Sequence, residues 1–171
     1  VNDPILRKNT GTNTPAIINI ELVPGNKIKI TVLPKGFGSE NKSKIFMLNP
    51  TSTTKDIINS VISSIRDAGP DACPPYMVGI GIGGDLSKAV YLSKKALTKK
   101  IGFLADKPHF KKIAKEIFKK ANALKIGPNG AGGKTTVLGV NILSYPTHIA
   151  GMPLAVNISC HALRSATKIL R

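Results

Sequence analysis

The sequence predicts an α/β (α+β) fold, in which a mixed sheet begins with an N-terminal β-hairpin and continues with strand–helix units. Two observations predict this class. Two alternating segments lie near the start of the chain, and uncharged apolar segments of strand length then take turns with segments of helical spacing. The chain has 171 residues, of which 42% are hydrophobic, so we expect residues 1–171 to form a single domain with one packed core.

The predicted hairpin joins residues 16–23 (AIINIELV) to residues 27–33 (KIKITVL). Both segments alternate between apolar and polar side chains, and the Pro-Gly-Asn sequence between them favours a tight turn. A glycine-rich polar loop is expected over residues 34–42, and a short strand over residues 44–48. These segments make up the expected first part of the sheet.

Four later segments are predicted to be helices. The first begins at a capping-box pattern formed by Thr53 and Asp56 and ends at a Gly-Pro pair. The second covers residues 85–97, and the third is a lysine-rich helix that follows a linker at residues 102–108. A closing helix is expected over residues 161–170.

Three uncharged apolar segments are predicted to be buried strands: residues 76–82 (YMVGIGI), 135–143 (TTVLGVNIL) and 154–159 (LAVNIS). Their strand length and their bounding glycine and polar residues favour strands over buried helices. A glycine-rich loop at residues 127–134 leads into the second of these strands.

The charge balance is strongly basic. The chain carries 25 Lys and Arg residues against 9 Asp and Glu, a net charge of +16, which favours anionic partners. Thirteen lysines lie between residues 88 and 134, and a solvated lysine face on a helix is the ordinary result of such a pattern. The chain has no Trp, so a base-stacking surface is disfavoured. A basic, non-enzymatic module that binds nucleic acid or another anion stays open as an alternative.

No apolar run approaches the roughly 18 residues that a membrane span needs. The first residues lack the pattern of a signal peptide, and two cysteines are too few for a disulfide framework. We therefore expect a cytoplasmic protein with no membrane partner. The chain begins at Val1 rather than at Met, which fits either a processed chain or a piece of a longer protein.

Two glycine motifs imitate nucleotide-binding loops. The glycines at 79, 81 and 84 have the spacing of a dinucleotide fingerprint, but no second strand with an acidic residue at its end follows about 20 residues later. Residues 133–135 (GKT) lack the earlier glycine of a phosphate-binding loop, since Pro128 occupies that position, and they precede a strand instead of a helix. For the glycines at 79, 81 and 84 we favour a structural role, in which they allow close backbone packing at the end of a strand.

The cysteines are candidates for chemistry. Cys160 and His161 are neighbours in sequence and their side chains would rarely face each other, so thiol catalysis by this pair is disfavoured; His148 is better placed to meet a cysteine in space. A buried free cysteine is the commoner role, but thiolates also bind the irons of iron–sulfur clusters. Cys160 is predicted to lie where a strand ends and a helix begins, and a helix N-terminus would favour a thiolate there.

Six groups of residues, in order along nearly the whole chain, resemble class I iron–sulfur fumarate hydratases and the related L(+)-tartrate dehydratases. The resemblance is to the alpha subunit or N-terminal catalytic domain of that family. The matching residues are 4–11 (PILRKNTG), 34–42 (PKGFGSENK), 72–75 with 78–84 (ACPP and VGIGIGG), 127–136 (GPNGAGGKTT), 147–150 (THIA) and 157–162 (NISCHA).

The resemblance implies a hydro-lyase with a 4Fe-4S cluster, one iron of which acts as a Lewis acid on the substrate hydroxyl. Cys73 and Cys160 match the second and third cysteine ligands of the family. The first ligand of the family lies upstream of Arg7, in a Cys-Gln-Asp-Thr-Gly-like segment that this sequence does not contain. We therefore expect residues 1–171 alone to be inactive and to hold no stable cluster.

The resemblance also implies residues that contact the substrate. His148 matches a catalytic histidine that contacts the substrate, and its imidazole could bind a carboxylate or move a proton. Arg7 could hold a carboxylate through two parallel hydrogen bonds. Gly36 and Gly38 would let the substrate approach the backbone closely.

The function expected first is the interconversion of fumarate and L-malate, with L(+)-tartrate dehydration as the alternative within the family. A beta subunit or C-terminal domain is the expected partner, in a homodimer or heterotetramer, and nucleic acid is disfavoured as a partner. If one cluster binds both cysteines, Cys73 and Cys160 should lie at the same end of the domain. His148 and the turn with Gly36 and Gly38 should then lie nearby.

Overall fold

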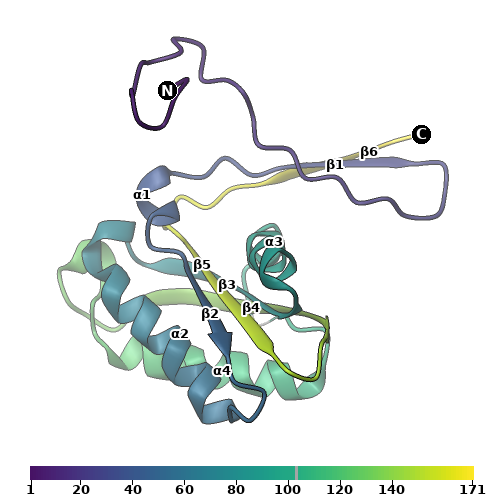
Figure 1. Cartoon of the computed structure of the whole chain (residues 1–171). Helices are drawn as coiled ribbons and strands as arrows, with labels where there is room; N and C mark the ends of the chain where they lie inside the picture. The colour runs from purple at the N-terminus through teal and green to yellow at the C-terminus, as the bar shows by residue number, and fades with distance from the viewer. Residues whose placement is uncertain (103) are drawn as a thin grey trace. The chain divides into compact units, whose positions relative to one another are not determined.

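The computed structural model describes residues 1–102 and 104–171 of the chain (Figure 1). These residues form two compact units: Val1–Lys29 with Ile169–Arg171, and Ile30–Lys168. The larger unit contains a four-stranded sheet and the helices that pack on it. The predicted α/β class is therefore confirmed.

The four strands of the main sheet lie in the order β2, β5, β3, β4. Their bounds are Lys44–Leu48 (β2), Tyr76–Gly84 (β3), Val137–Thr147 (β4) and Met152–Ser159 (β5). β3 runs parallel to β4 and antiparallel to β5, and β2 pairs antiparallel with the other edge of β5. The sheet is mixed, as predicted, and the start of β3 lies beside the end of β5.

Helices cover both faces of this sheet (Figure 1). α2 (Thr54–Ala68) and α4 (Pro108–Ala123) enclose a hydrophobic core with β3, β4 and β5. α3 (Leu86–Leu97) packs on the opposite face, which β3 lines with glycines. A Cβ on Gly79 would lie 2.2 Å from the Ser93 carbonyl oxygen, so the glycine spacing of β3 is explained by close packing against α3.

Two helices begin where the sequence predicts. Thr53 caps α2: its hydroxyl accepts a hydrogen bond from the Asp56 N–H at 3.4 Å, and the Asp56 carboxylate accepts one from the Thr53 N–H at 2.7 Å. Asp85 caps α3 by accepting a hydrogen bond from the Lys88 N–H at 2.7 Å. Local capping signals are thus enough to locate the first turns of both helices.

The predicted N-terminal hairpin is wrong. Residues 16–23 form no strand, and β1 (Ile28–Val32) pairs instead with β6 (Ala166–Leu170) in a separate two-stranded sheet. The predicted closing helix is wrong as well, because its C-terminal part forms β6. The hydroxyl oxygens of Thr31 and Thr167 lie 2.9 Å apart, a cross-strand contact that suits this pairing.

Three single turns of helix lie in the connections: α1 (Phe37–Glu40), η1 (Gly69–Ala72) and η2 (Pro128–Gly130). α1 lies inside the segment predicted as a polar loop, and η1 directly follows α2. None of the helices in the described ranges is long and apolar enough to span a membrane.

Candidate functional site

Both cysteines lie at one end of the main sheet. Cys73 follows η1 and precedes β3, and Cys160 follows the last residue of β5. Because β3 and β5 are antiparallel neighbours, the start of one meets the end of the other. The His161 N–H donates to the Cys73 carbonyl oxygen at 3.2 Å, and Nδ1 of the same histidine lies 3.2 Å from that oxygen. We call this end, which holds both cysteine segments, the cysteine end.

The two cysteines differ in exposure and backbone shape. Cys73 is exposed and has a left-handed backbone with φ of 52°, whereas Cys160 is half-buried. Both thiols are free. After Cys160 the described chain turns and reaches β6 without forming a helix, so the prediction that a helix N-terminus stabilises a thiolate at this position is wrong. Any such stabilisation has to come from groups on other segments.

The turn that carries Gly36 and Gly38 also reaches the cysteine end; we call it the Gly36 turn. Gly36 is the N-cap of α1, which packs against η1 and β5. A Cβ on Gly38 would lie at an ordinary 3.6 Å from the Asp71 carbonyl oxygen of η1, and a Cβ on Gly36 would meet no described atom within 4 Å. Lys42 holds the far side of the turn to Asp71 through a 2.7 Å ion pair. The space beside Gly36 is open, as the close approach of a ligand to the backbone requires.

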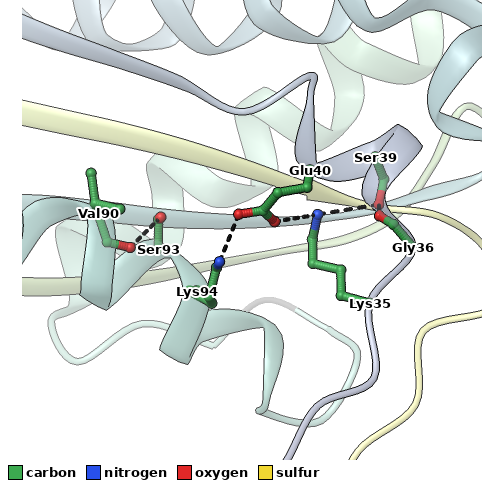
Figure 2. A network of polar contacts seen from close by, with 7 residues as sticks. All are labelled: Lys35, Gly36, Ser39, Glu40, Val90, Ser93 and Lys94. Atoms are coloured by element: carbon green, nitrogen blue, oxygen red, sulfur yellow. Dashed lines mark hydrogen bonds and ion pairs between the residues drawn. The ribbon is translucent and has the colours of Figure 1, made fainter. Parts of the chain in front are cut away.

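Sequence reasoning misses a charged group next to this turn. Lys35 and Lys94 both form ion pairs with the Glu40 carboxylate (Figure 2). The only signal in the sequence is a pair of opposite charges inside a glycine-rich loop. Lys94 is 54 residues from Glu40 and belongs to α3, so no local pattern predicts its contact with the loop.

The glycine loop at residues 127–134 packs against the segment that carries Cys73. The Asn129 N–H donates to the Pro74 carbonyl oxygen at 3.0 Å, and η2 packs against η1. The loop then leads into β4, whose start lies beside the start of β3. It therefore supports the cysteine end from a third segment of the chain, and a strand follows it, as predicted.

His148 lies at the other end of the main sheet. It occupies the turn between β4 and β5, next to Thr147, whose hydroxyl donates to the Gly84 carbonyl oxygen at 2.9 Å. The 8 residues of β5 separate this turn from Cys160, a distance of roughly 25 Å along a strand. The expectation that His148 lies near both cysteines is therefore wrong within one chain. We call this end, with residues 147–152, the histidine end.

Arg7 belongs to the smaller unit. It lies in a turn in which the Arg7 N–H donates to the Asp3 carbonyl oxygen at 3.0 Å and the Asn2 N–H donates to that of Lys8 at 2.8 Å. The arginine is exposed, and its backbone φ is 58°. Its contact with a substrate carboxylate stays a prediction.

The donor set at the cysteine end suits part of an iron–sulfur site. Two free thiols, on segments that a backbone hydrogen bond joins, are the ligand type that cluster irons take. Within residues 1–102 and 104–171, no group of three or more His, Cys, Asp or Glu side chains is placed to hold a metal ion. Cys73 and Cys160 therefore fit two ligands of a cluster, and a further ligand would have to come from outside these residues.

Known proteins share the sequence of nearly the whole chain. Residues 1–168 match the family model described as fumarate hydratase (Fumerase). The chain is 41% identical over 167 residues to a Methanocaldococcus jannaschii protein named "Putative L(+)-tartrate dehydratase subunit alpha", and the match covers 96% of this chain and 58% of that protein. It is 31% identical over 164 residues to the L(+)-tartrate dehydratase subunit alpha of Escherichia coli O157:H7, with 95% and 54% covered. The chain thus spans little more than half the length of these curated relatives.

Proposed function

Because the chain belongs to the fumarate hydratase (Fumerase) family, we propose that it is part of a hydro-lyase that removes water from a hydroxy-dicarboxylate. L(+)-tartrate is the substrate that we favour. A single observation carries this choice: the relatives described above are named as alpha subunits of L(+)-tartrate dehydratase. Interconversion of fumarate and L-malate, the reaction expected first from the sequence, becomes the second candidate, and the description of the family supports it.

The cofactor that we propose is a 4Fe-4S cluster held in part by Cys73 and Cys160. When bound, such a cluster supplies a Lewis acid for a substrate hydroxyl. The chain itself joins the two cysteine segments at one end of the sheet through the contact between His161 and the Cys73 carbonyl oxygen. It also offers the open backbone of the Gly36 turn and, beside it, two lysines that share one carboxylate. Positive charge at this end favours a dianionic substrate.

The rest of the active site is proposed to come from outside this chain. The relatives carry the words "subunit alpha" in their names, which supports a beta subunit or an equivalent C-terminal domain as the partner. We propose the predicted substrate contacts for Arg7 and His148. His148 lies at the other end of the sheet from the cysteines of its own chain, so its contact would require the cysteine end of another copy or a rearranged turn. The homodimer or heterotetramer expected from the sequence stays a prediction.

The test uses the complete protein, which is this chain with any sequence that its coding region adds and with its beta part, purified and assayed without oxygen. Dehydration of L(+)-tartrate yields oxaloacetate, whereas dehydration of L-malate yields fumarate, so the two products separate the two candidates. We expect kcat/KM for L(+)-tartrate to exceed that for L-malate by about tenfold or more. A higher kcat/KM for L-malate would mean that L-malate, and not L(+)-tartrate, is the substrate. Cluster-loaded protein that turns over neither would overturn the hydro-lyase proposal.

A further inference from the structure

Glu40 lies at the centre of a polar network that joins the Gly36 turn to α3 (Figure 2). It is the last residue of α1, and its carboxylate forms ion pairs with Lys35 at 2.8 Å and with Lys94 of α3 at 2.6 Å. Lys35 also donates to the Ser39 hydroxyl at 3.2 Å, and that hydroxyl donates to the Gly36 carbonyl oxygen at 2.9 Å. The network therefore surrounds the Gly36 turn and joins it to α3, the helix on the glycine-lined face of the sheet.

This network is more buried than an ordinary surface ion pair of the same chain. The side chains of Lys35 and Glu40 are 8% and 26% exposed, whereas those of Lys120 and Glu116, an ion pair on α4, are 45% and 50% exposed. Burial alone would raise the pKa of Glu40, but hydrogen bonds from Lys35 and Lys94 outweigh it and lower that pKa below its usual value. The carboxylate is therefore charged at neutral pH.

The charges in the network do not balance. Among the described residues, two ammonium groups share the one carboxylate of Glu40, which leaves a surplus positive charge. One lysine would be enough to anchor the turn, and a second adds charge that has to be desolvated. Burial lowers the pKa of Lys35, while its hydrogen bond to the Glu40 carboxylate acts to raise it. Cys160 is also among the groups that interact electrostatically with Lys35, so the ammonium lies within electrostatic reach of the cysteine end. An anionic ligand bound there would offset the surplus.

We propose that Glu40 is a positioning residue for dicarboxylate binding at the cysteine end. By bridging Lys35 and Lys94, it holds the Gly36 turn in shape and keeps the surplus positive charge beside it. The turn then presents its open backbone to one carboxylate of the substrate, and the charge strengthens that contact. The inference rests on the proposed function, since it takes a dicarboxylate as the ligand, but it concerns binding and not the chemical step.

The experiment compares Glu40→Gln with Glu116→Gln in the complete, cluster-loaded protein. Glu116→Gln is a matched control, because it makes the same change in an exposed Lys–Glu pair on α4. We expect Glu40→Gln to raise KM for L(+)-tartrate by about tenfold or more and to change kcat by less than about threefold. It should also speed amide hydrogen exchange over residues 35–42. Glu116→Gln should change neither KM nor exchange, and Glu40→Asp should recover part of the loss because it keeps the carboxylate.

Equal KM values in Glu40→Gln and the wild type would overturn the proposal, as would a loss confined to kcat. If Glu40→Gln fails to fold or to load iron, Lys94→Gln takes its place, since it removes the α3 side of the bridge and leaves Glu40 present. A raised KM in Lys94→Gln supports the positioning role, and an unchanged KM overturns it.

If the complete protein turns over neither substrate, the proposed function fails separately. Calorimetric binding of L(+)-tartrate then decides: weaker binding in Glu40→Gln supports the positioning role, and equal or absent binding overturns it.

Discussion

The two ends of the main sheet are built in different ways. At the cysteine end, segments far apart in sequence meet: the Gly36 turn, η1, the loop at residues 127–134 and the residues after β5. At the histidine end, the exposed His148 makes contacts within its own turn, where its Nδ1 accepts from the Ala150 N–H at 3.2 Å and its carbonyl oxygen accepts from the Gly151 N–H at 3.2 Å. Long-range contacts carry a larger loop-closure cost than a local turn does. The cysteine end is therefore assembled by long-range contacts, whereas His148 is held by contacts within its own turn, which Thr147 joins to β3 through its hydrogen bond to the Gly84 carbonyl oxygen.

The largest expected effect comes from breaking the cysteine end. In the complete protein, Cys73→Ser or Cys160→Ser should abolish both the cluster and the dehydration of L(+)-tartrate, because each change removes a thiolate ligand. Iron and sulfide per chain, the visible absorption of the anaerobic protein and oxaloacetate formation measure the loss. A variant that keeps full activity would remove that cysteine from the ligand set.

The histidine end is tested by His148→Asn. As the resemblance implies, we expect kcat in the complete protein to fall by about a hundredfold while the iron content stays unchanged, because a proton-transfer or substrate-contacting group is lost. His109→Asn, at an exposed histidine near the start of α4, is the control and should leave kcat as it is. Steady-state kinetics and iron analysis of both variants give the comparison.

Either outcome for His148 changes the comparison of the two ends. Roughly 25 Å of strand separates His148 from Cys160 in one chain. A loss of turnover with iron retained would mean that the histidine end of another copy, or a rearranged turn, reaches the cysteine end in the assembled protein. An unchanged kcat would leave the reaction to the cysteine end and its partner, and the predicted role of His148 would be wrong.

A matched pair of glycines sharpens the contrast between the ends. A Cβ on Gly36 at the cysteine end, or on Gly151 at the histidine end, would meet no described atom within 4 Å. Gly36→Ala and Gly151→Ala should therefore change the free energy of unfolding by less than about 1 kcal/mol. Only Gly36→Ala should raise KM for L(+)-tartrate, by several-fold, because its methyl group would occupy the space that the substrate uses. Melting curves and kinetics decide, and equal KM values in both variants would contradict substrate contact at Gly36.

Sequence patterns predict the parts of the fold that local physics determines. α2 and α3 begin at side-chain caps, and β3 is an uncharged strand between glycine and proline signals. The segment at residues 16–23 shows where such patterns fail, since it alternates as a strand does and forms none. Ile20 in that segment is 81% exposed, whereas Ile80 of β3 is completely buried. Alternation of apolar and polar residues predicts a strand with one face that could be buried. The segment itself does not identify the partner that would bury that face.

The candidate site also depends on contacts that no local sequence pattern predicts. The resemblance locates Cys73, Cys160 and the Gly36 turn along the chain, but the strand order decides which of them meet. β5 enters the sheet antiparallel to β3, and this brings Cys160 to Cys73 and leaves His148, in the turn before β5, at the far end. The contact between Glu40 and Lys94 joins residues 54 positions apart, and no spacing rule predicts it.

The smallest expected effect is the contribution of Glu40 to stability in acid. Hydrogen bonds from Lys35 and Lys94 outweigh burial and hold the pKa of Glu40 below its usual value. A carboxyl group whose pKa is lowered by folding stabilises the protein above the pKa that it has when unfolded, and that contribution disappears as the pH falls through the lowered folded-state pKa. Between about pH 6 and about pH 3 the complete protein should therefore lose about 1 kcal/mol of its free energy of unfolding from this source.

Melting temperatures over this pH range should fall less steeply in Glu40→Gln than in the wild type. Glu116→Gln should follow the wild type within a few tenths of a kcal/mol, because its ion pair is exposed. Parallel curves for all three proteins would show that the bridge adds nothing to stability, and the cysteine end would then depend on its backbone contacts alone.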